Sequence, residues 1–128
     1  MRVEALASWK RARGSLRAAK ALVDVDADSA VSRAYYAAFH AASAVFLQRG
    51  MSFRKHSALE AAIHRDLVKA GHWSAELGAA FKSLVDLRRT GDYGGPAPLT
   101  SADARKAVEF AEQILGAVAA AQPELENT

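Results

Sequence analysis

The 128-residue sequence contains no cysteine, which excludes disulfide bonds, thiolate metal sites and a cysteine nucleophile. It has three prolines, and aromatic residues make up only 8% of it, although 51% of its residues are hydrophobic. Alanine supplies much of this fraction, so we expect a core of closely packed helices. No continuous apolar stretch is long enough for a signal sequence or a membrane span, so we expect a soluble cytoplasmic protein without a membrane partner.

The chain also lacks the strong positive charge of a dedicated nucleic-acid binder, because its net charge is only +3. The positive charge is uneven, however, and gathers in residues 10–20, 49–56 and 88–89. An arginine-rich start can imitate a transit peptide, but the surface of a folded helix explains the same spacing. Whether the three basic segments meet depends on the fold.

Apolar residues recur at helical spacing along five segments, and no segment shows a strand pattern or an internal repeat. Short connections between these segments imply antiparallel neighbours. The sequence therefore predicts an all-α fold, an up-and-down bundle of four long helices plus a shorter fifth. Residues 1–122 would form one domain and residues 123–128 a flexible tail. The expected helices cover residues 3–23, 29–49, 57–70, 74–87 and about 100–122.

Capping residues define the expected helix ends. Side-chain oxygens favour helix starts, and glycine or proline favours helix ends. Ser57 with Glu60, and Thr100 with Asp103, have capping-box spacing. Two further helix starts are predicted at Asp28 or Ser29 and at Ser74. Helix ends are predicted at Gly50, Gly71 and Pro123, and a turn is predicted over GDYGGPAP.

The segment 29–49 is apolar nearly all round, which is typical of a central helix. Its polar exceptions are therefore informative. Arg33, Tyr36 and His40 lie with Ser32 on one stripe of this helix. A hydrogen-bonded core residue is the plain alternative for His40. His64 and His72 have no partner at the spacing of a metal site, so we expect neither a metal nor a cofactor.

The segment LRRTGDYGG places Arg88, Arg89, Asp92 and Tyr93 within six positions. Its glycines lack the spacing of a phosphate-binding loop and do not follow a strand. The dipole of a helix C-terminus would by itself explain two arginines. A purely structural role is also open for the other two residues. In that case Tyr93 packs over the end of the bundle and Asp92 pairs with an arginine.

Three motifs occur in order: SRAYYAAFHAA at 32–42, RGMSFRKHSAL at 49–59 and R-x-x-x-D-Y at 88–93. Together they resemble the HEPN family, specifically its small prokaryotic stand-alone proteins with AYYAxFHA and RxxxDY motifs. The resemblance covers roughly residues 25–120. It implies a helical bundle that commonly forms homodimers, with a cleft lined by the fourth helix and its exit.

The resemblance also implies two activities. One is metal-independent RNA cleavage by an arginine that is followed four to six residues later by a histidine. The other is partnership with a small nucleotidyltransferase, often in a toxin–antitoxin module. In some of these systems the nucleotidyltransferase adenylylates a tyrosine just beyond the arginine, so Tyr93 is a possible modification site by position.

The sequence departs from the nuclease motif, because Tyr93 stands where a histidine can occur and no histidine lies between residues 73 and 128. RNA cleavage needs a proton acceptor, a proton donor and a cation. Arg88 can be the cation. Histidine suits proton transfer because its pKa is about 6.5, whereas the pKa values of tyrosine and aspartate are about 10 and 3.9. His40 or His56, from this chain or a second protomer, would have to fill the gap.

Binding makes smaller demands than cleavage. Arginines can grip phosphate, and an exposed tyrosine can stack on a base. The sequence therefore favours a nucleotide- or RNA-binding partner of a nucleotidyltransferase. The alternatives are a ribonuclease toxin with catalytic candidates Arg88 and His40, and a purely structural dimeric protein. The predicted binding residues are Arg33, Tyr36, His40, Arg88, Arg89, Asp92 and Tyr93.

Overall fold

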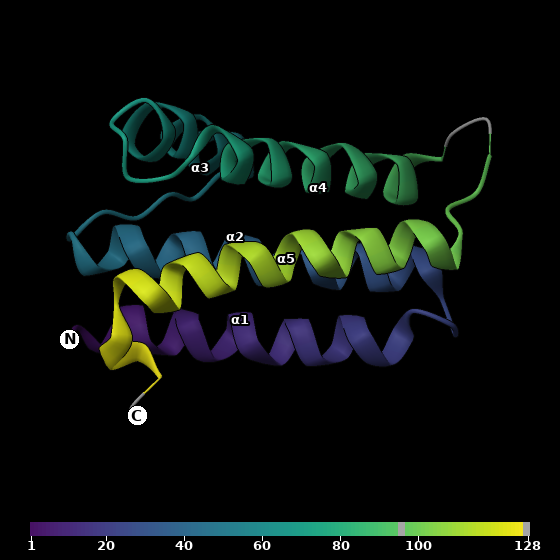
Figure 1. The fold of residues 1–128 in the computed structure, drawn as a ribbon, viewed down its shortest axis with the longest axis horizontal. Helices are drawn as coiled ribbons and strands as arrows, with labels where there is room; N and C mark the ends of the chain where they lie inside the picture. Colours follow the sequence, from purple (N-terminus) through teal and green to yellow (C-terminus); the bar gives the residue numbers. More distant parts are fainter. Residues whose placement is uncertain (95–96, 127–128) are drawn as a thin grey trace.

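The chain folds into an up-and-down helical bundle, shown in Figure 1, in a computed structural model that describes residues 1–94 and 97–126. Every regular element in these ranges is helical, so the predicted all-α class is confirmed. Four long helices carry the fold: α1 (Val3–Leu22), α2 (Ala27–Gln48), α4 (Ala75–Tyr93) and α5 (Ser101–Ala121). The short helix α3 (His56–Ala62) lies between α2 and α4 in the chain.

Helix α2 is the centre of the molecule. It contacts α1, α4 and α5, and in Figure 1 it crosses the middle of the bundle together with α5, between α1 and α4. Seven of its alanines are fully buried, and their small side chains let neighbouring helices approach closely. The central position predicted for this segment is therefore confirmed. The seven alanines are Ala30, Ala34, Ala37, Ala38, Ala41, Ala42 and Ala44.

Several predicted helix ends are confirmed. Ser74 caps α4 by accepting a hydrogen bond from the backbone N–H of Leu77, at 3.1 Å. Thr100 and Asp103 form the predicted capping box of α5. The predicted start of α2 was wrong by two residues, because Asp26 caps this helix and accepts hydrogen bonds from Ser29.

The predicted capping box at Ser57 and Glu60 was wrong. Helix α3 begins at His56 after Lys55, which makes no side-chain cap, and a π-helical segment (Ile63–Val68) continues it. Glu60 lies beyond the first turn of α3, and its carboxylate accepts a hydrogen bond from the Tyr35 hydroxyl instead. A residue predicted to cap a helix start therefore belongs to a contact between helices.

Helix α4 extends beyond Leu87, where its apolar pattern was predicted to end, and runs to Tyr93. Gly91 lies inside the helix, at a place where a Cβ atom would be 3.0 Å from Leu99 Cδ1. Gly94 then ends the helix with φ of +78°, a conformation that favours glycine. Asp92 and Tyr93 are thus helical residues, and the predicted turn begins only at Gly94; its residues 95–96 lie outside the described ranges.

Residues 123–126, predicted to begin a flexible tail, include a further element of regular structure. Pro123 ends the helical path as expected, but Pro123–Leu125 forms a 3₁₀ turn and Leu125 is fully buried. The Glu126 carboxylate lies 3.7 Å from the Arg13 guanidinium of α1. Residues 127–128 lie outside the described ranges. Within those ranges, no helix has both the length and the apolarity to cross a membrane.

Candidate functional site

Arg88 lies against two tyrosines of the central helix. Its guanidinium carbon is 4.8 Å from the ring centroid of Tyr35 and 5.7 Å from that of Tyr36. The Arg88 side chain is only 17% exposed, so water screens these contacts weakly. A cation over an aromatic ring contributes about 1 to 2 kcal/mol when it is partly desolvated. The tyrosine rings therefore hold the positive charge of Arg88 in a defined place.

Tyr35 is fixed in turn by Glu60 of α3. The fully buried tyrosine donates a hydrogen bond from its hydroxyl to Glu60 Oε2, at 2.9 Å. Burial raises the pKa of Tyr35 above its ordinary range, and the hydrogen bond to the carboxylate raises it further. The hydroxyl consequently stays protonated at neutral pH and remains a donor. Helix α3 thus supports the ring on which Arg88 rests.

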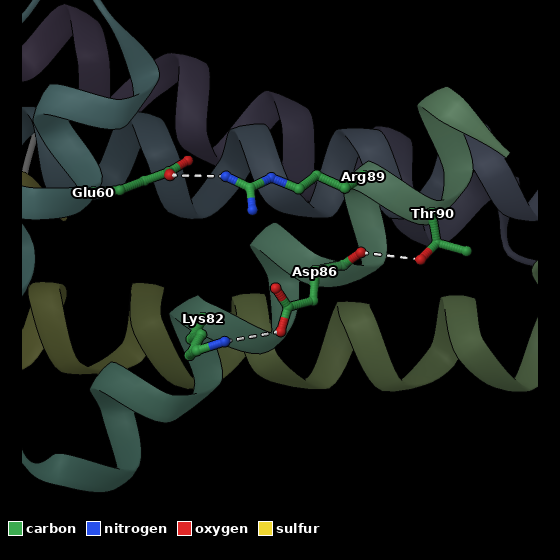
Figure 2. Close-up of polar contacts among 5 residues, drawn as sticks. All are labelled: Glu60, Lys82, Asp86, Arg89 and Thr90. Carbon is green, nitrogen blue, oxygen red and sulfur yellow. Dashed lines mark hydrogen bonds and ion pairs between the residues drawn. The ribbon is translucent and has the colours of Figure 1, made fainter. Parts of the chain in front are cut away.

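Arg89 points toward the same carboxylate from the solvent side (Figure 2). Its guanidinium lies 4.0 Å from Glu60 Oε1, and its side chain is 63% exposed. An exposed ion pair of this length contributes between zero and about 1 kcal/mol. Tyr35, rather than Arg89, therefore determines the position of Glu60. Figure 2 also shows Asp86 with Lys82 and Thr90, ordinary contacts one helical turn apart along α4.

Asp92 lies one turn beyond Arg88, and its Oδ2 is 3.1 Å from Arg88 Nε. The two groups form an ion pair, but the N–H group is not aligned with the oxygen. Among the described residues the buried Nε has no hydrogen-bond partner. Tyr93 is 80% exposed and does not pack over the bundle end, so that interpretation of it is wrong. Asp92 thus pairs with Arg88 by charge and not by a hydrogen bond from Nε, and Tyr93 is open to solvent.

Tyr36 has four nitrogen-containing side chains around its half-buried ring. The Arg33 guanidinium carbon lies 5.0 Å from the ring centroid. The rings of His56 and His40 have centroids 5.5 and 6.1 Å away, and Arg88 is the fourth neighbour. We call these five residues the Tyr36 cluster. It combines α2, α3 and α4, and it brings together two of the basic segments seen in the sequence.

The two histidines of the Tyr36 cluster also flank Phe39. His56 lies 4.7 Å and His40 lies 5.6 Å from it, measured between ring centroids. Burial lowers the pKa of His40, and the nearby positive charges of Arg11, Arg33 and His56 lower it further. The His40 side chain is therefore neutral over a wider pH range than a free histidine.

Among the predicted binding residues, Arg33, Tyr36, His40 and Arg88 come together in the Tyr36 cluster. Asp92 pairs with Arg88 of the cluster. Arg89 lies outside the cluster, near Glu60, which in turn accepts a hydrogen bond from Tyr35. Their role in binding stays a prediction. Neither Tyr35 nor Glu60 was predicted as a site residue, because Glu60 matched a capping motif. His56 was a candidate for proton transfer, but the sequence did not predict where it lies. One signal was present, because His56 and Glu60 are four residues apart and share a helix face.

A larger concave feature lies elsewhere. A groove of about 390 Å³ runs between α1 and α5, with Trp9, Leu16 and Leu115 in its walls. Its Arg13 is already paired with Glu126. The Tyr36 cluster is better suited to an anion, because it holds two arginines on aromatic rings and only one of them, Arg88, has a carboxylate partner among the described residues. Within the described ranges, no three His, Asp or Glu side chains are placed to hold a metal ion.

Comparison with solved structures supports the fold. The crystal structure of TT1696 from Thermus thermophilus is similar with a TM-score of 0.77 and 28% sequence identity. The match covers 90% of this chain and 95% of that chain.

Two curated relatives have the same family name. The chain is 39% identical over 112 residues to a UPF0332 protein of Thermotoga maritima. This match covers 86% of the chain and 85% of the relative. It is also 38% identical over 86 residues to a UPF0332 protein of Gloeobacter violaceus, and this match covers 66% of the chain and 68% of the relative. The family model for the HEPN domain matches residues 5–121. The resemblance to the HEPN family is thereby confirmed, and the chain belongs to the HEPN domain family.

Proposed function

We propose that this HEPN protein binds the phosphate groups of a nucleotide or RNA at the Tyr36 cluster. The observation that supports this most directly is the placement of Arg88, which rests on two tyrosine rings and whose buried Nε has no hydrogen-bond partner among the described residues. Guanidinium groups bind phosphate through charge-assisted hydrogen bonds. Holding Arg88 in advance lowers the entropy cost of gripping a ligand.

The proposed biological setting is a two-component module with a small nucleotidyltransferase, in which this chain is a homodimeric partner subunit. Membership of the HEPN family supports the setting, and the exposure of Tyr93 supports a modification role for it. Tyr93 is 80% exposed at the end of α4, so another protein could reach its hydroxyl. Recovering the protein from its own cells and analysing it by mass spectrometry would test for a nucleotide on Tyr93 and for a bound partner.

The binding proposal is tested by Arg88→Ala, with Lys82→Ala as the control on the same helix. Lys82 is 67% exposed and pairs only with Asp86 among the described residues, so its loss removes a charge away from the cluster. Losing one charged phosphate contact should weaken oligonucleotide binding about 10- to 100-fold in a fluorescence anisotropy titration. The control should change affinity less than about threefold. Equal affinities for the two variants would contradict the proposal.

A ribonuclease remains the second candidate, because His40 and His56 share the Tyr36 ring with Arg88. The test is cleavage of single-stranded RNA without metal, expressed as a rate that Arg88→Ala abolishes. A protein that binds RNA or AMP without cutting would support the binding function alone. Should Arg88→Ala and Tyr93→Phe alter neither nucleotide affinity nor partner binding, the protein would instead be a structural dimerisation unit.

A further inference from the structure

The Tyr36 cluster contains two kinds of cation. Arg33 and Arg88 are charged at every physiological pH, whereas the imidazoles of His40 and His56 can each be neutral or protonated. The permanent charges lie 5.0 and 5.7 Å from the Tyr36 ring centroid, and the histidine rings lie at similar distances. Protonating both histidines would therefore double the positive charge around one ring. An anion at this place would experience that change directly.

We propose that His40 and His56 form a proton-dependent half of the anion site, which binds the phosphodiester backbone of a single-stranded nucleic acid as imidazolium ions. This inference rests on the proposed function and deepens it, because it names two further groups of this chain that contact the ligand and makes binding depend on pH. The cluster draws its cations from three helices and distributes them around a ring. Several phosphates along a strand match that distribution better than one phosphate does.

The surroundings of His40 favour an anion. Arg11 of α1 and Arg33 of α2 face it, and His56 of α3 interacts with it electrostatically. Its backbone carbonyl accepts a hydrogen bond from the Ser8 hydroxyl at 2.7 Å, which fixes this part of the helix. In the free protein these positive neighbours oppose protonation. A bound phosphate supplies the missing negative charge and reverses that preference.

The surroundings of His56 are mainly aromatic. Tyr35 lies 5.8 Å from it between ring centroids, and Tyr36 and Phe39 are closer. On its own helix the ionised group one turn away is Glu60, and α4 contributes Arg88 across the shared tyrosines. The Glu60 carboxylate accepts from Tyr35, and the Asp92 carboxylate pairs with Arg88. The structure shows neither carboxylate bonded to a histidine of the cluster.

The direction of the pH effect follows from linkage. Bound phosphate stabilises the imidazolium form, so the proton affinity of each histidine rises on binding and the complex takes up protons. Affinity must then increase as the pH falls through the histidine range. If binding shifts each histidine by one pKa unit, the gain is about tenfold per histidine and about a hundredfold for both.

Oligouridylate is the probe, because neither its uracil bases nor its internal phosphodiesters titrate between about pH 5.5 and 8. Affinity measured by fluorescence anisotropy at constant ionic strength should increase severalfold from pH 8 to pH 5.5 in the unmodified protein, because the lowered pKa of His40 leaves part of the full gain below this range. His40→Gln combined with His56→Gln should abolish this increase. The matched control is the pair His64→Gln and His72→Gln, two exposed histidines whose removal should preserve the pH dependence.

Arg88→Ala separates the inference from the proposed function. This variant should bind oligouridylate more weakly at every pH, but its affinity should depend on pH as steeply as that of the unmodified protein. A pH-independent affinity that still needs Arg88 would overturn the inference and leave the proposed function standing. Histidine NMR titration of the unmodified protein gives a second measurement that does not depend on a variant's folding. Oligouridylate should raise the titration midpoints of His40 and His56 only, and unchanged midpoints would also overturn the inference.

Discussion

Tyr35 has two separate functions at the scale of a single residue. Its ring supports the Arg88 guanidinium at 4.8 Å, and its hydroxyl binds Glu60 at 2.9 Å. A substitution that removes only the hydroxyl separates these functions. The same side chain therefore contributes its ring to the proposed binding site and its hydroxyl to the contact between α2 and α3.

Tyr35→Phe should destabilise the protein by about 1 kcal/mol, because Glu60 loses its hydrogen bond while the ring remains. The change would be measured as the free energy of unfolding in urea. Tyr93→Phe removes the same hydroxyl from an 80% exposed ring and should leave stability unchanged within about 0.5 kcal/mol. Similar losses in the two variants would show that the Glu60 contact has no energetic role.

His40 makes stability depend on pH. Its pKa is lowered in the folded protein by burial first and then by Arg11, Arg33 and His56, so the unfolded chain binds protons more readily. The contribution of His40 to stability is therefore fully present above its ordinary pKa of about 6.5 and is lost as the pH falls from there toward the lowered value. Thermal unfolding between pH 8 and 5 should show this loss, and His40→Gln should reduce it. His72→Gln, at an exposed position, should retain the full dependence.

At the scale of an element, α4 depends on glycine for its packing. A Cβ atom at Gly78 would lie 2.8 Å from Val68 Cγ2, in the π-helical segment that precedes α4. A branched side chain has few rotamers with which to move away. The absence of a side chain at Gly78 is thus a condition for this helix to approach its neighbour.

Gly78→Ala should destabilise the protein by about 1 to 3 kcal/mol, because the overlap outweighs the gain of about 1 kcal/mol in helix propensity. Gly116→Ala is the matched control. It lies inside α5, and a Cβ atom there would meet nothing within 4 Å. The control should stabilise the protein by about 0.5 to 1 kcal/mol. Denaturant unfolding of both variants would show whether the two signs differ as expected.

The helices themselves could be predicted from sequence because their signals are local. Apolar spacing and the caps at Ser74 and Thr100 depend on residues a few positions apart. The end of α4 could not be predicted in this way, since Gly91 and Asp92 suggest a turn when read locally. In the structure the last turn packs against the segment that leads into α5, because a Cβ atom added at Gly91 would lie 3.0 Å from Leu99 Cδ1, and no local pattern shows this proximity.

The candidate site is a property of the whole molecule, because residues from α2, α3 and α4 form it, and only part of it could be predicted from sequence. Arg33, Tyr36 and His40 share a stripe of one helix, so their grouping is periodic and visible in the sequence. Tyr35 meets Glu60 across 25 sequence positions, and no local pattern encodes such a contact. Glu60 also matched a capping motif, which supplied a competing and incorrect explanation.

The C-terminal segment also stabilises the molecule as a whole. Leu125 is fully buried beyond the last helix, so Leu125→Ala should lower the free energy of unfolding by about 2 to 4 kcal/mol. This is a large part of the roughly 5 to 15 kcal/mol that is typical of a small domain. Glu124→Ala, next to it and exposed, should have an effect below about 0.5 kcal/mol, as measured by thermal unfolding.

The central position of α2 has a consequence for the kinetics of amide hydrogen exchange. Its backbone is enclosed by α1, α4 and α5, so its amides can exchange only when the whole bundle opens. The last turn of α4 is more exposed, and its amides can exchange through local opening. Tyr35 and Tyr36 thus belong to the slowest-exchanging part of the molecule, while Arg88 approaches them from a helix whose end opens more often. A ligand that binds between them would slow exchange in α4 and leave the exchange rates of α2 tied to global unfolding.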